Sequence, residues 1–129
     1  MAGGKGTRLL PLTQKTPKPL LKIKGVPIIE KIILNFRKQG FHNFIISINY
    51  LGHKIKKYLG NGEKLKVNID YIEEKKYLGT AGSLSLINFK NTIFPIIVTN
   101  SDLISEIDYH NLISYHNKKK ADITICGKN

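Results

Sequence analysis

The chain has 129 residues, of which 41% are hydrophobic and 23% are charged. This composition is ordinary for a globular protein and excludes a disordered chain, and no apolar stretch approaches the roughly 20 residues that a membrane-spanning helix needs. The single cysteine, Cys126, excludes an internal disulfide and a cysteine-based zinc cluster, and it fits a reducing compartment. We therefore expect one cytoplasmic domain, or part of one.

The clearest helix is expected over residues 27–39. Ile28, Ile32 and Phe36 recur at helical spacing and form one broad apolar face. Proline at position 27 suits a first helical turn, and Gly40 supplies a stop signal.

The rest of the chain alternates between apolar runs and amphipathic segments. In chain order we expect a buried strand over 44–48, a helix over 54–59, a strand over 65–71, a helix over 81–89, a strand over 95–99, a helix over 108–118 and a strand over 121–126 that packs Cys126. Such alternation predicts an α/β fold with a mainly parallel sheet, in which ligands bind beyond the carboxyl ends of the strands.

The charge of the chain is strongly positive. Lys and Arg number 21 against 9 Asp and Glu, which gives a formal net charge of +12. This balance favours anionic partners such as nucleic acids or phosphorylated small molecules. Because the lysines are spread along the whole chain, charge alone favours an ordinary solvated surface over a nucleic-acid patch.

A glycine-rich segment near the N-terminus, Gly3-Gly4-Lys5-Gly6-Thr7-Arg8, carries the strongest chemical signal. Glycines let backbone N–H groups approach an anion closely. Arg8 is suited to bidentate phosphate contacts, whereas Lys18, between Pro17 and Pro19, is suited to act as a restrained point charge. The segment matches neither the dinucleotide fingerprint nor the P-loop. Glycines and cations together nevertheless indicate a phosphate-binding site.

These motifs resemble a known family. AGGKGTRLLPLT followed by TPKPLLKIKGVPIIE is similar to the signature of the sugar-1-phosphate nucleotidyltransferases, and the resemblance continues through LGTAG at 78–82 and VTNSD at 98–102. It implies a Rossmann-like three-layer α/β sandwich. It also implies that a sugar 1-phosphate attacks the α-phosphorus of a nucleoside triphosphate and releases pyrophosphate, with a mild preference for guanylyl transfer and with no nucleic acid or membrane partner.

The resemblance also implies roles for individual residues. Arg8 would hold the β- and γ-phosphates, and Lys18 would bridge the α-phosphate and the incoming sugar phosphate, so that both are catalytic. Asp102, after the expected strand 95–99, would ligate Mg²⁺. Nucleotide-binding contacts are implied for Ala2, Gly3, Gly4, Gly6, Thr7, Gly79 and Thr80.

Two adjacent carboxylates, Glu73 and Glu74, are a further candidate. Neighbours on a strand point to opposite faces, so these two are not expected to form an acid/base pair. We expect them to flank the nucleotide pocket or to face water.

The resemblance finally implies that residues 1–129 are a partial nucleotidyltransferase domain, the nucleotide-binding half. The family has an apolar strand before the glycine segment, and a second half with the sugar site and another metal carboxylate. We therefore expect a fragment with little or no transferase activity alone, although a misplaced start codon would also account for the absent strand. Two other interpretations stay open: a non-catalytic nucleotide-binding or regulatory module of the same fold, and a basic nucleic-acid-binding domain.

Overall fold

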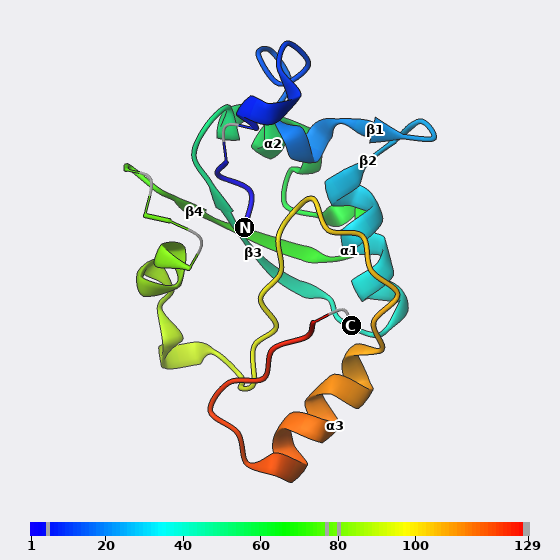
Figure 1. The fold of residues 1–129 in the computed structure, drawn as a ribbon, viewed down its shortest axis with the longest axis vertical. Coiled ribbons are helices and arrows are strands. Elements are labelled where there is room, and N and C mark those ends of the chain that lie inside the picture. Colours follow the sequence, from blue (N-terminus) through cyan, green and yellow to red (C-terminus); the bar gives the residue numbers. More distant parts are fainter. Residues whose placement is uncertain (5, 77, 80, 128–129) are drawn as a thin grey trace.

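The computed structural model describes residues 1–4, 6–76, 78–79 and 81–127, and the side chains of Arg8 and Asn91 fall outside this description. Figure 1 shows how the elements are arranged. The strands and α-helices are, in chain order, β1 (Lys22–Ile23), β2 (Val26–Pro27), α1 (Ile28–Lys38), β3 (Asn43–Ile48), α2 (Gly52–Leu59), β4 (Asn68–Glu73) and α3 (Tyr109–Lys119). Short 3₁₀ turns are η1 (Thr7–Leu9), η2 (Lys18–Leu20), η3 (Glu63–Leu65), η4 (Gly82–Leu86) and η5 (Phe89–Asn91).

The central sheet is parallel. Strands β3 and β4 pair in parallel with Phe44 opposite Ile69 and Ile46 opposite Tyr71, while β1 and β2 form a small antiparallel hairpin. Helix α2 lies between the two parallel strands in sequence, which is the βαβ arrangement of α/β proteins. The α/β class predicted from the alternating pattern is confirmed.

Helix α1 forms where its pattern predicts. Its apolar face is buried, and Gly40, with φ of 84°, ends it in a backbone conformation that glycine adopts without strain. Ile29 and Ile33 pack against β3 and α2 in the main core, together with Ile46 and Ile55. The helix therefore anchors one face of the sheet.

A second apolar cluster joins α1 to α3. The rings of Phe36 and Tyr109 are stacked with centroids 4.1 Å apart, and Phe41 meets both edge-on. The Asp108 side chain caps α3 by accepting a hydrogen bond of 2.9 Å from the backbone N–H of Asn111.

Across the described ranges, none of the helices has the length and apolar character needed to span a bilayer.

The first two residues lie between distant parts of the chain. The backbone N–H of Ala2 donates to Ser47 in β3 (2.8 Å), while Met1 donates to the carbonyl of Thr99 (2.7 Å) and accepts from the N–H of Ser101 (3.0 Å). Figure 1 shows this N-terminal segment beside β3. It brings the glycine-rich segment next to the residues that follow the apolar run at 95–99.

Three predicted elements are wrong. Residues 81–89 form 3₁₀ turns instead of an α-helix. In η4 only Ser83 is buried, so no packed apolar face stabilises a longer helix. The runs 95–99 and 121–126 form no strand in the described chain. A strand needs a neighbour to pair with, and the second run exposes its apolar side chains and Cys126.

A fourth element is displaced. The strand predicted over 65–71 begins only at Asn68, because Lys66 adopts a left-handed conformation with φ of 55° and cannot be part of an extended strand. The other predicted helices and the strand 44–48 are confirmed with ends shifted by one or two residues.

Candidate functional site

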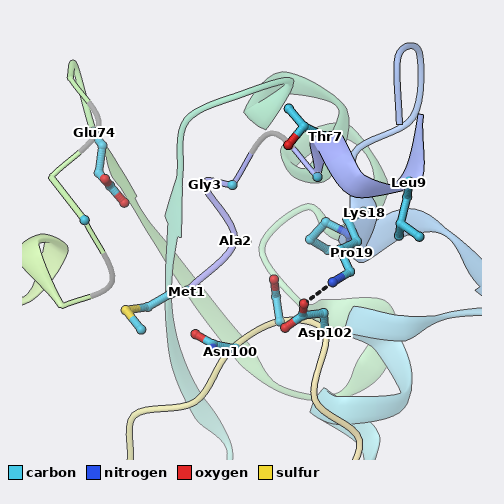
Figure 2. Close-up of a pocket in the computed structure, with 14 residues that line it drawn as sticks. Met1, Ala2, Gly3, Thr7, Leu9, Lys18, Pro19, Glu74, Asn100 and Asp102 are labelled. Carbon is cyan, nitrogen blue, oxygen red and sulfur yellow. Dashed lines mark hydrogen bonds and ion pairs between the residues drawn. The ribbon is translucent and has the colours of Figure 1, made fainter. Parts of the chain in front are cut away.

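A cavity of about 480 Å³ opens between the glycine-rich segment, Lys18 and Pro19, the segment that follows β4, and residues 100–102. Figure 2 shows it with its lining side chains. The lining consists of Met1, Ala2, Gly3, Gly4, Gly6, Thr7, Leu9, Lys18, Pro19, Glu74, Gly79, Asn100, Ser101 and Asp102. The residues come from four separate parts of the chain, and this position matches the ligand site expected beyond the carboxyl ends of parallel strands.

The glycine-rich segment is shaped by Gly6. This residue has φ of 62° and ψ of 33°, a left-handed conformation, and its carbonyl accepts hydrogen bonds from the Thr13 hydroxyl (2.8 Å) and from the N–H of Leu9 (3.0 Å). A Cβ at position 6 would lie 2.9 Å from Cγ2 of the buried Thr13. The position therefore requires glycine both for its backbone angles and for the space beside it.

Opposite charges meet at one end of the cavity. The ammonium of Lys18, at the start of η2, forms an ion pair with the Asp102 carboxylate across 84 positions of sequence. The two side chains are 35% and 33% exposed, so the pair contributes less than about 1 kcal/mol to stability. Its importance lies in placing a cation and a carboxylate together at the mouth of a cavity, as Figure 2 shows.

A buried carboxylate lies at the other end. Glu74 accepts a hydrogen bond from the Ser47 hydroxyl at Oε1 and one from the N–H of Leu78 at Oε2 (3.2 Å). Its neighbour Glu73 lies on the opposite face, where the hydrogen bond from the Lys56 ammonium (2.5 Å) lowers the pKa of the Glu73 carboxyl. The alternation of strand neighbours thus separates the two acids, and Glu74 is the one that flanks the cavity.

The cavity brings together most of the residues singled out from the sequence. Eight of them line it: Ala2, Gly3, Gly4, Gly6, Thr7, Lys18, Gly79 and Asp102. Thr80 and the side chain of Arg8 lie outside the described residues. Glu74, expected to flank the pocket or face water, also lines it, whereas five lining residues were not predicted as site residues: Met1, Leu9, Pro19, Asn100 and Ser101. Each of the five is close in sequence to a predicted one.

Asp102 is the candidate metal ligand. In the described part of the chain no three His, Cys, Asp or Glu side chains are grouped so that they could hold a metal ion. Mg²⁺ does not require such a cage, because it is commonly bound by one or two carboxylates together with phosphate oxygens and water. A single carboxylate at the edge of a cavity fits a metal that arrives with a polyphosphate.

The chain is similar to known proteins over most of its length. The sequence profile described as "Nucleotidyl transferase" matches residues 1–129. A mannose-1-phosphate guanylyltransferase from Mycobacterium tuberculosis is 32% identical over 97% of this chain and 35% of its own length. A UTP–glucose-1-phosphate uridylyltransferase from Synechocystis is 31% identical over 99% of this chain and 36% of its own length. The chain thus spans about a third of these relatives.

The fold is also similar to a solved structure. The crystal structure of HddC from Yersinia pseudotuberculosis, complexed with GMP-PN, superposes with a TM-score of 0.75 at 30% identity. The match covers 89% of this chain and 51% of the Yersinia chain.

Proposed function

The chain belongs to the nucleotidyl transferase family, and from this premise we propose that its cavity binds a nucleoside triphosphate for nucleotidyl transfer to a sugar 1-phosphate. The products would be a nucleoside diphosphate sugar and pyrophosphate. The observation that carries the proposal is the convergence of the glycine-rich segment, Lys18 and Asp102 on one cavity.

The chemistry of this reaction suits the residues present. Phosphoryl and nucleotidyl transfer depend mainly on positioning and on neutralising the charge of the phosphates. The backbone of the glycine-rich segment is suited to hold phosphate oxygens, and the Lys18 ammonium would neutralise the phosphate under attack. Mg²⁺, when bound at Asp102, supplies further positive charge to the phosphates.

The nucleotide is proposed from the similar proteins. The mycobacterial relative is a guanylyltransferase, and the Yersinia structure contains GMP-PN, so GTP is the first candidate. The uridylyltransferase from Synechocystis makes UTP the second.

Since Cys126 has no cysteine partner within the sequence, we also propose a reducing, cytoplasmic location.

The transfer activity is proposed for the whole protein, because relatives are about three times as long as the part matched here. The 129-residue chain alone is expected to bind nucleotide with little or no turnover. The test extends the chain with its flanking sequence and measures pyrophosphate release for four triphosphates against a panel of sugar 1-phosphates.

Two variants make this test specific. Lys18→Ala and Asp102→Ala should each lower the rate by about 100-fold or more. The first removes a positive charge at the reacting phosphates, and the second removes the carboxylate proposed to hold Mg²⁺. The matched controls are Lys22→Ala and Glu73→Gln, which change exposed charges outside the cavity lining. Rates like those of the wild type in Lys18→Ala or Asp102→Ala would contradict the proposal.

Binding measurements discriminate against the two alternatives. A basic nucleic-acid-binding domain would bind duplex DNA with an affinity that falls steeply with salt. Free triphosphate, added at the same concentration of phosphate charge as the DNA, would not displace it. A non-catalytic module would bind triphosphate, yet the extended protein would release no pyrophosphate with any sugar phosphate.

A further inference from the structure

The glycine-rich segment and Lys18, both proposed above to bind phosphates, are joined by residues 10–17. We call these residues the connecting segment, which runs from the end of η1 to the start of η2. None of its residues, all of which the structure describes, is part of the cavity lining. Its conformation nevertheless influences the cavity, because the segment is covalently continuous with a lining residue at each end, Leu9 and Lys18.

Thr13 couples the connecting segment to the phosphate-binding backbone. The residue is fully buried, and its hydroxyl donates a hydrogen bond of 2.8 Å to the carbonyl of Gly6. Its Cγ2 also packs beside Gly6, where an added Cβ would come within 2.9 Å of it. A displacement of the connecting segment at Thr13 would therefore either move Gly6 or break this hydrogen bond.

Two side chains, one just before α2 and one in its first turn, hold the connecting segment. The Tyr50 hydroxyl donates to the carbonyl of Gln14 (3.1 Å) and lies 3.5 Å from the carbonyl of Thr13. The Lys54 ammonium donates to the carbonyl of Lys15, and Figure 1 shows the segment beside α2. Within the described chain, the backbone N–H groups of the segment bond only to carbonyls three residues earlier. Its hydrogen bonds to distant parts of the chain therefore come from Tyr50 and Lys54.

Both side chains come from a closely packed part of the fold. Strand β3 ends at the buried Ile48, and α2 begins at Gly52 after a left-handed turn at Leu51, with φ of 52°. A Cβ added to Gly52 would lie 2.9 Å from the Cβ of Ile48, so the helix starts in direct contact with the end of the strand. This packing fixes Tyr50 and Lys54 relative to the core.

Neither Tyr50 nor Lys54 lines the cavity, so neither is placed to contact a bound phosphate. We propose that they are positioning residues: by fixing the connecting segment, they hold Thr13, and through it the backbone of Gly6, in the conformation that binds a triphosphate. This role rests on the proposed function. Groups that are held in place before a ligand arrives bind it more tightly, since binding does not have to order them.

The first measurement is the affinity of the 129-residue chain for GTP, by calorimetry with Mg²⁺ present. Tyr50→Phe removes the hydroxyl and keeps the ring, and it should weaken binding by about three- to tenfold. Lys54→Met should weaken binding by a similar factor. Lys54→Arg keeps a charged donor, so its affinity should stay within about twofold of wild type.

The matched control is Tyr71→Phe. The Tyr71 hydroxyl also donates to a backbone carbonyl, that of Gly60 (2.6 Å), and neither of these residues lines the cavity. Removing this hydroxyl should leave the affinity for GTP unchanged. Urea unfolding is measured for every variant, because a residue that only stabilised the fold would lower the free energy of unfolding without changing the affinity of the folded chain.

Two readouts test whether Tyr50 acts through Gly6. Thr13→Val removes the hydroxyl that donates to Gly6, so in this background Tyr50→Phe should change the affinity for GTP by less than about twofold. The N–H of Leu9 also donates to the Gly6 carbonyl (3.0 Å), and its hydrogen exchange should be about threefold or more faster in Tyr50→Phe but not in Tyr71→Phe. This second readout decides the matter if Thr13→Val does not fold.

The outcomes separate the two proposals. If folded wild type does not bind GTP or the other triphosphates, the proposed function fails, and the positioning role fails with it. If wild type binds but Tyr50→Phe binds equally well, nucleotide binding stands and the role of Tyr50 is overturned. The same conclusion follows if the effect of Tyr50→Phe is undiminished in Thr13→Val, or if exchange at Leu9 is unchanged.

Discussion

Replacing Gly6 by alanine is expected to destabilise the protein through two separable effects. The left-handed backbone at φ of 62° costs an alanine about 1–2 kcal/mol. The new Cβ would also lie 2.9 Å from Cγ2 of Thr13, whose residue is fully buried, and such overpacking costs about 1–3 kcal/mol. Together they predict a loss of about 2–5 kcal/mol in the free energy of unfolding.

The chain offers matched controls for each effect. Gly25 has φ of 81° with open space around it, so Gly25→Ala should show the backbone cost alone, about 1–2 kcal/mol. Gly4 has open space and no positive φ, so Gly4→Ala should leave stability close to wild type or slightly higher. Urea unfolding followed by circular dichroism measures all three variants, with an unchanged slope confirming a like-for-like comparison.

A double-mutant cycle isolates the contact. Thr13→Ser removes the methyl group that the new Cβ would meet but retains the hydroxyl that donates to the Gly6 carbonyl. The serine change should therefore cost less in the Gly6→Ala background than in wild type. If Gly6→Ala is as stable as Gly4→Ala, or if the two changes are additive, the description of this turn is refuted.

Three other changes test separate parts of the structure. Because the Lys18–Asp102 pair is about a third exposed, Lys18→Met and Asp102→Asn should each alter the free energy of unfolding by less than about 1 kcal/mol in urea titrations, and a larger loss would show that the pair is structural. The Tyr58 hydroxyl donates to the Glu30 carboxylate, and this hydrogen bond raises the pKa of Tyr58 above its ordinary value of 10.0. The free energy of unfolding should therefore fall as pH rises past 10.0, and Tyr58→Phe should reduce that fall. Equal pH profiles of unfolding free energy would contradict this assignment. Asp108→Ala should lower the free energy of unfolding by about 1 kcal/mol, because it removes the side-chain cap of α3, and Asp108→Ser should keep most of that stability. Thermal melts measure both variants, and equal stability of Asp108→Ala and wild type would contradict the role of the cap.

Elements whose stability is encoded locally could be predicted from the sequence. Helix α1 combines a continuous apolar face with a proline before it and Gly40 after it, and all of these signals lie within one short stretch. The buried run in β3 is equally local, since isoleucines at 46 and 48 face the helices. Each needs only its own residues to be recognised.

Elements that depend on a partner could not be predicted in this way. The run 95–99 has the composition of a strand, yet it pairs with no strand among the described residues, and Thr99 and Ser101 form backbone hydrogen bonds with Met1. Ile123 and Ile125 are 79% and 86% exposed, because no strand lies beside them in the described residues. Composition indicates that a segment is suited to a sheet, but pairing decides whether it joins one.

The candidate site also combines features that a local motif indicates with features that depend on a partner strand. The glycine-rich segment, Lys18 and Asp102 were identified from motifs, and the cavity brings them together. The pairing of Ser47 with Glu74 is different, because it depends on the parallel register of β3 and β4. A single sequence showed that Glu73 and Glu74 face opposite sides of a strand, without showing which side would hold the cavity.

The most direct test of the phosphate-binding site is a calorimetric titration of the 129-residue chain with GTP and Mg²⁺, compared with the Lys18→Met variant under the same conditions. Wild type should bind saturably, and the variant should bind about tenfold or more weakly, since a charged hydrogen bond to phosphate is lost. Equal affinities for the two folded proteins, or no saturable binding by wild type, would contradict the assignment of this cavity.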